Sequence, residues 1–168
     1  MDVVLEKDKC LVKDNGLKSQ LTQKGFGYKN NLLYYIDLFE TMYLLEREKI
    51  RVIDGNKRIT KEALNNICRK EIKDFENKFL VFKEFRDNGY IVKDGLVFGF
   101  DFRVYLKNNC KQHSHTEFVV DAKESHKAKE DVSKLIKSER LANTINAKYV
   151  IAIVDKEKKI YKIKIEKI

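Results

Sequence analysis

A tyrosine and a histidine that could act together stand ten positions apart in GLVFGFDFRVYLKNNCKQHSHTEFVV, residues 95–120. Tyr105 lies on the polar phase of an alternating segment, and His115 opens the next apolar segment. If these segments pair as neighbouring strands, the phenol and the imidazole face one cleft. Such a pair suits RNA cleavage without a metal, because a base must take the ribose 2′-OH proton and an acid must protonate the departing 5′ oxygen. The same pattern also fits an ordinary exposed strand tyrosine.

The proposed base needs positive charge nearby. A phenol with its ordinary pKa near 10 is a poor base at neutral pH unless cations lower that pKa. Arg103, two residues earlier on the same phase, or a lysine from another strand can supply the charge. A cation also stabilises the negative charge that grows on phosphorus during cleavage.

A second hypothesis uses a sparse pattern of carboxylates in the same region. Asp101, followed by Asp121-Ala-Lys123, matches the order in which metal-dependent nucleases hold Mg²⁺ and position water. This pattern often arises by chance. His113 and His115 resemble a zinc pair, but no thiolate or carboxylate at ligand spacing completes the site. We therefore expect no metal and no other cofactor.

Composition indicates an anionic partner and a reducing compartment. The 168 residues include 35 lysines and arginines against 26 aspartates and glutamates, a net charge of +9. Nucleic acid is the commonest partner of such a protein, although the charge can also serve only solvation. Three dispersed cysteines do not make a disulfide framework. With no apolar leader and no run of roughly 18 apolar residues, we expect a cytoplasmic protein without membrane contact.

Periodicity predicts helices mainly in the first half of the chain and strands mainly in the second. The expected helices are 32–49, 61–75 with Thr60 as N-cap, 77–88 ending at Gly89, and 130–145. The helix at 130–145 should bury one face, made of Val132, Leu135, Ile136, Ala142 and Ile145. The expected later strands are 100–106, 115–122, 149–154 and 161–168. In the first of these strands, the side chains of Phe100, Phe102, Val104 and Leu106 should all lie on one face. A boundary near residue 76 separates a mixed α/β domain, 1–75, from a second domain, 76–168.

Several stretches together resemble the archaeal tRNA-splicing, or tRNA-intron, endonucleases. LTQKGFGYKN and LFETMYLLEREKIRV resemble the amino-terminal domain of that family. KFLVFKEFRDNGYIVKDGLVFGFDFRVY carries its most specific signature, and HTEFVV and YVIAIVD resemble two later motifs. The resemblance covers most of the chain. It implies an α+β fold in which the small N-terminal domain precedes a C-terminal nuclease domain with a central mixed sheet.

The resemblance also implies roles for particular residues. Tyr105 matches the family's general base, and His115, not His113, matches its general acid. The family lysine that stabilises the transition state falls on Ala147 in an ungapped comparison, and we assign its role to the neighbouring Lys148. An inactivated variant and a naturally impaired subunit are the alternatives. Arg140 matches an arginine that stacks on a flipped bulge base, a role that suits a guanidinium.

The implied substrate is precursor tRNA, or another RNA, folded into a bulge–helix–bulge. The implied products are a 2′,3′-cyclic phosphate and a 5′-hydroxyl, made without a metal. Family enzymes are dimeric or tetrameric, and homotetramers use an acidic loop after the AIVD strand to bind another subunit. The corresponding loop here, DKEKK, is net basic. We therefore expect an α2β2 assembly with a second, structural subunit that supplies the acidic loop. A non-catalytic role in such an assembly is a further alternative.

Overall fold

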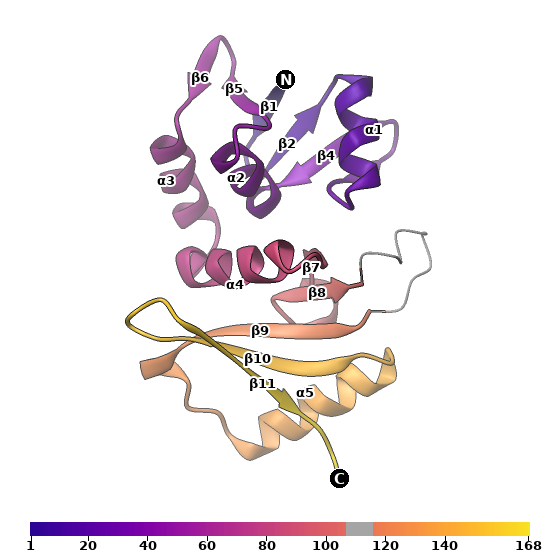
Figure 1. Ribbon diagram of the computed structural model, residues 1–168, viewed down its shortest axis with the longest axis vertical. Helices are drawn as coiled ribbons and strands as arrows, with labels where there is room; N and C mark the ends of the chain where they lie inside the picture. Colours follow the sequence, from indigo (N-terminus) through magenta and orange to yellow (C-terminus); the bar gives the residue numbers. More distant parts are fainter. Residues whose placement is uncertain (107–115) are drawn as a thin grey trace. The chain divides into compact units, whose positions relative to one another are not determined.

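The computed structural model describes residues 1–106 and 116–168, and the chain divides into two compact units, Met1–Phe75 and Glu76–Ile168 (Figure 1). His113 and His115 lie outside the described residues. Within the described ranges, no helix is both long and apolar enough to cross a bilayer. Both units combine helices with a sheet, so the expected α+β fold class is confirmed.

The first unit is built on a six-stranded sheet with the order β3-β4-β2-β1-β5-β6. Its strands are β1 (Asp2–Glu6), β2 (Lys9–Val12), β3 (Tyr28–Asn30), β4 (Leu33–Asp37), β5 (Arg51–Asp54) and β6 (Lys57–Ile59). Only β1 and β5 pair in parallel among these neighbours. The helices are α1 (Asn15–Gln23), α2 (Leu38–Glu46) and α3 (Lys61–Glu71), and the Thr60 side chain caps α3 as predicted by accepting from Ala63 N.

The predicted helix over 32–49 is wrong in its first part, where β4 occupies Leu33–Asp37. The strand gives way to the helix at Asp37: its carboxylate accepts from Glu40 N at 2.7 Å, and Asp37 N donates to Glu40 Oε2 at 3.3 Å. This reciprocal capping box starts α2 at Leu38. The aromatic and β-branched residues before it suit a strand, and they pair with β2. Continuous apolarity concealed this boundary in the sequence. Helix α1 was not predicted.

The second unit contains a five-stranded sheet with the order β11-β10-β9-β8-β7. The strands are β7 (Ile91–Asp94), β8 (Phe102–Tyr105), β9 (Phe118–Glu124), β10 (Lys148–Val154) and β11 (Ile160–Ile165). β9 and β10 are parallel and are connected through α5 (Val132–Thr144), whereas the other pairs are antiparallel. The expected mixed sheet is therefore present. Helix α4 (Phe75–Asp87) ends as predicted, with Gly89 at φ 86°.

Helices α4 and α5 cover opposite faces of this sheet, as Figure 1 shows. On the α4 face, the Phe82 ring lies 6.0 Å from the Phe102 ring, and the Phe85 ring lies 6.4 Å from the Phe118 ring. The α5 face carries a buried cluster of Phe100, Val119, Ala142, Ala147, Tyr149 and Ile151. Because side chains alternate along a strand, the side chains of Phe118 and Val119 lie on opposite faces of the sheet.

Two predicted orientations are wrong. Phe100 packs against Tyr149 on the α5 face, with ring centroids 5.4 Å apart, whereas Phe102 packs against Phe82 of α4 on the other face. The alternation fails there because β8 begins only at Phe102, after a turn in which Gly99 has φ 78°. On α5, Val132 and Ile136 are exposed rather than inward, although Ala142 is buried.

Candidate active site

Three strand ends meet at one end of the second sheet. Tyr105 is the last residue of β8, Glu117 immediately precedes β9, and Lys148 is the first residue of β10. Glu117 N donates to Val104 O at 2.8 Å, and Lys148 N donates to Glu117 O at 3.0 Å. This backbone ladder brings together the ends that carry Tyr105 and Lys148. The described chain resumes at Thr116, and the predicted acid His115 lies outside the described residues.

Tyr105 is half-buried and lies opposite Ile91 in the β7–β8 pair. Arg103, which the sequence suggested as a cation for Tyr105, anchors the turn between β7 and β8. Its Nε donates to Asp94 O at 2.8 Å, and its guanidinium carbon lies 5.3 Å from the Phe98 ring centroid. These contacts give Arg103 a structural role in that turn.

Lys148 is exposed and paired. Its Nζ lies 2.6 Å from Glu117 Oε1, and 5.7 Å from the centroid of the Phe118 ring. The hydrogen bond and negative charge of Glu117 raise the pKa of Lys148 above its ordinary value. Lys148 stands beside Phe118 in the parallel register, so it starts on the α4 face.

The neighbouring Ala147 has a different environment. It is 4% exposed and belongs to the buried cluster on the α5 face. Its backbone N donates to Ala142 O at 3.0 Å, which closes the end of α5 against the start of β10. The position at which the ungapped comparison places a lysine is thus a core position in this chain, and the exposed ammonium is that of Lys148.

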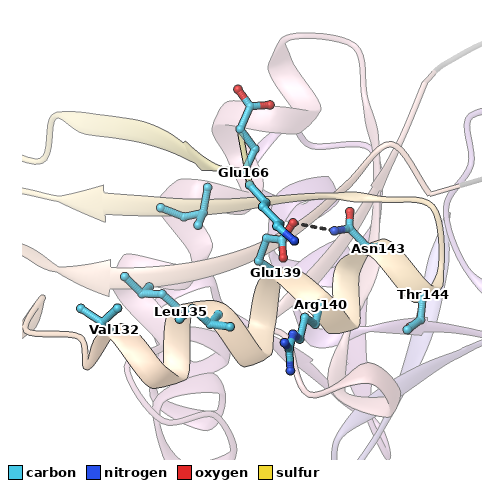
Figure 2. A pocket seen from close by; sticks show the side chains of 10 residues that line it. Val132, Leu135, Glu139, Arg140, Asn143, Thr144 and Glu166 are labelled. Atoms are coloured by element: carbon cyan, nitrogen blue, oxygen red, sulfur yellow. Dashed lines mark hydrogen bonds between the residues drawn. The ribbon is translucent and has the colours of Figure 1, made fainter.

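Arg140 lies on the exposed side of α5, and it lines a groove between this helix and the end of β11. Figure 2 shows this groove, together with the hydrogen bond from Asn143 Nδ2 to Glu139 Oε1 at 2.5 Å. Leu135, Ile136 and Ile165 give part of this groove an apolar lining. An exposed guanidinium is able to stack on an unpaired planar base.

The carboxylates of the second hypothesis do lie together, but protein groups already bond them. Asp101 Oδ2 accepts from Ala122 N at 2.9 Å, and Oδ1 lies 2.7 Å from Lys78 Nζ. Asp121 Oδ1 accepts from Asp101 N at 3.2 Å, and Oδ2 accepts from Tyr149 Oη at 2.8 Å. These contacts bind β8, β9 and β10 together. Over residues 1–106 and 116–168, no cluster of three or more His, Cys, Asp or Glu side chains is arranged to hold a metal.

Sequence reasoning did not identify Glu117. An acidic residue two positions after a histidine has no special spacing, and its partner Lys148 is 31 residues away. Only the parallel pairing of β9 with β10 brings the two together.

The chain belongs to the tRNA intron endonuclease family. Residues 1–65 match the family's N-terminal domain, and residues 75–162 match its catalytic C-terminal domain. A tRNA-splicing endonuclease of Thermococcus onnurineus is 33% identical over 154 residues, which is 92% of this chain and 88% of the relative. One from Pyrococcus abyssi is 32% identical with the same coverage. One from Methanococcus vannielii is 28% identical over 90% of this chain and 85% of the relative. The expected family is thereby confirmed, and these relatives are archaeal proteins.

Proposed function

We propose that this chain is a tRNA-splicing endonuclease subunit, an RNA lyase that cuts precursor tRNA at bulge–helix–bulge intron junctions. The observation that carries the proposal is the match of residues 75–162 to the catalytic domain, in which Tyr105 ends β8 at the end of the sheet where β9 and β10 begin. The net charge of +9 supports an RNA substrate. The names of the archaeal relatives support splicing of tRNA in particular.

The proposed reaction is an attack of the RNA on itself. The Tyr105 phenolate takes the proton of the 2′-OH, and the 2′ oxygen forms a bond to phosphorus. The bond from phosphorus to the 5′ oxygen breaks, and protonated His115 donates a proton to that leaving oxygen. Lys148 stabilises the negative charge on the non-bridging oxygens. The products are a 2′,3′-cyclic phosphate and a 5′-hydroxyl, and no metal takes part in these steps.

Substrate recognition and assembly belong to the same proposal. Arg140, on the exposed side of α5, stacks on an unpaired bulge base. The turn between β10 and β11, residues 155–159, carries three lysines against two acids. A second subunit with an acidic loop therefore completes an α2β2 enzyme, which acts in the cytoplasm.

Cleavage of a bulge–helix–bulge precursor in EDTA tests this proposal. The wild-type chain, with its partner subunit where one is needed, should cut equally well in EDTA and in Mg²⁺ and leave a 2′,3′-cyclic phosphate. His115→Ala should lose about 10²- to 10⁴-fold in rate. Complete loss of cleavage in EDTA, restored by Mg²⁺, would favour the metal-dependent alternative that uses Asp101, Asp121 and Lys123. If the assembly cuts equally well after Tyr105 and His115 of this chain are replaced, this chain is a structural subunit and its partner is the catalytic one.

A further inference from the structure

We propose that Glu117 is a positioning residue that holds the Lys148 ammonium at the end of the sheet where the scissile phosphate binds. This inference rests on the proposed function, and it adds a residue that neither the sequence pattern nor the family resemblance singled out. Glu117 touches no substrate in this account. It acts on the reaction only through Lys148.

The first support is that Glu117 is itself fixed at both backbone groups. Its N–H is bonded to Val104 O, next to Tyr105, and its carbonyl is bonded to Lys148 N. The backbone from which the Glu117 side chain extends is therefore fixed between β8 and β10. Its side chain is 29% exposed, against 57% for Lys148, so the carboxylate is the better-held member of the pair.

The second support is the surface on which the lysine lies. The Phe118 ring below the ammonium is held by two other rings, that of Phe85 at 6.4 Å and that of Tyr90 at 6.0 Å. A lysine side chain alone has many rotamers, and an exposed one is poorly oriented. Contacts with Glu117 and with the Phe118 ring restrict Lys148 to a small region near the strand end.

The chemistry leaves the ammonium able to act on phosphate. An ammonium has three N–H donors, so its bond to Glu117 uses one of them. Glu117 is also the main cause of the raised pKa of Lys148, and Glu166 and Tyr90 act in the same direction. A neutral glutamine at position 117 would preserve the shape of the contact and remove its charge.

A matched pair elsewhere in the same unit provides the control. Lys162 Nζ lies 2.9 Å from Glu84 Oε1 and 5.6 Å from the Phe85 ring centroid, so this pair also combines a carboxylate with a ring. Both glutamates are partly exposed and both lysines are exposed. Exposed ion pairs contribute little to stability, so neither Glu117→Gln nor Glu84→Gln should change Tm appreciably.

The test is a double-mutant cycle on single-turnover cleavage of the precursor, with Glu117→Gln, Lys148→Met and both together. Glu117→Gln should lower the rate at least about tenfold in the wild-type background and have little effect once Lys148 is methionine. Glu84→Gln should cleave like wild type. An equal effect of Glu117→Gln in both backgrounds, or a rate like that of Glu84→Gln, would overturn the inference. So would faster cleavage by Glu117→Gln, because it would mean that the carboxylate withholds the ammonium.

Two measurements that need no cleavage separate this inference from the proposed function. One is binding of a precursor whose scissile 2′-OH is replaced by hydrogen. The other is NMR titration of the Lys148 side chain. Glu117→Gln should weaken binding only when Lys148 is present, and it should lower the pKa of Lys148. If the wild type binds the precursor but does not cut it, the proposed function fails. The precursor affinity and the pKa of Lys148 still show whether Glu117 positions Lys148. Unchanged affinity together with an unchanged Lys148 pKa would refute that role.

Discussion

At the scale of single residues, the phenol of Tyr105 is the group on which the proposed reaction depends first. The side chain is half-buried at the last position of β8, so it contributes little to the core. Its loss should therefore affect chemistry and leave folding intact. This separation makes the residue a clean test.

Tyr105→Phe removes only the phenolic oxygen, and we expect it to slow single-turnover cleavage by about 10²- to 10⁴-fold with little change in Tm. The matched control is Tyr161→Phe on the edge strand β11, where Tyr161 is 47% exposed. The control should cleave at the wild-type rate. If the two variants cleave alike, Tyr105 is not the base.

At the scale of elements, the join between α5 and β10 buries position 147 and leaves position 148 exposed. Ala147 belongs to the same buried cluster as Ala142 of α5 and Tyr149 of β10. A longer side chain there must either displace this packing or leave the core. Lys148, one residue later, starts on the other face.

We therefore expect Ala147→Lys to lower the free energy of unfolding by about 1–3 kcal/mol, as overpacked core substitutions do. It should bring no large gain in cleavage, whereas Lys148→Ala should slow cleavage. Thr144→Lys, at an exposed position in the last turn of α5, serves as the control for an added lysine and should stay close to wild-type stability. Urea unfolding and single-turnover rates measure both effects. A large gain from Ala147→Lys would mean that the lysine was lost from this chain rather than shifted by one position.

The half-buried carboxylate of Asp121 joins β9 to β10 and to the residue before β8, and its titration should affect stability. Burial raises the pKa of Asp121, and the charge of Asp101 adds to that effect, while the Tyr149 hydrogen bond opposes it. Because the folded pKa exceeds the unfolded value, near 3.9, the native state holds this proton over the window between the two values. Stability from this group is therefore present below the unfolded pKa and falls as pH rises through the folded pKa.

Asp121→Asn removes this titration. We expect the free energy of unfolding of the wild type, relative to that of the variant, to decrease as pH rises from about 3.9 through the folded pKa of Asp121. Urea unfolding of both proteins at a series of pH values measures the difference. A difference that is constant with pH, or that grows in favour of the wild type, would contradict the raised pKa.

At the scale of the whole molecule, the prediction concerns assembly. The net basic turn at residues 155–159 is held by Asp155, whose Oδ1 accepts from Glu157 N at 2.9 Å and from Lys159 N at 2.8 Å. A turn with excess positive charge is a poor match for a basic pocket on another copy. We expect the chain expressed alone not to form an active homotetramer, as measured by sedimentation velocity and cleavage. A stable, active homotetramer would remove the need for a second kind of subunit.

The sequence by itself determined the features that depend on local order along the chain. Tyr105 and its motif, the Thr60 cap, the turn at Gly89 and the helix within 130–145 are all readable because periodicity and capping act over a few residues. The boundary between β4 and α2 was missed for the same reason, since both elements are apolar and only the bonds between Asp37 and Glu40 separate them.

The tertiary structure alone decided how distant segments combine. It turned Phe100 away from Phe102, buried Ala147, joined Asp101 with Asp121, and paired Glu117 with Lys148 across 31 positions of sequence. These contacts depend on strand register and on which face each side chain takes. A shift of one residue exchanges the two faces, so local patterns cannot choose between adjacent positions such as Ala147 and Lys148.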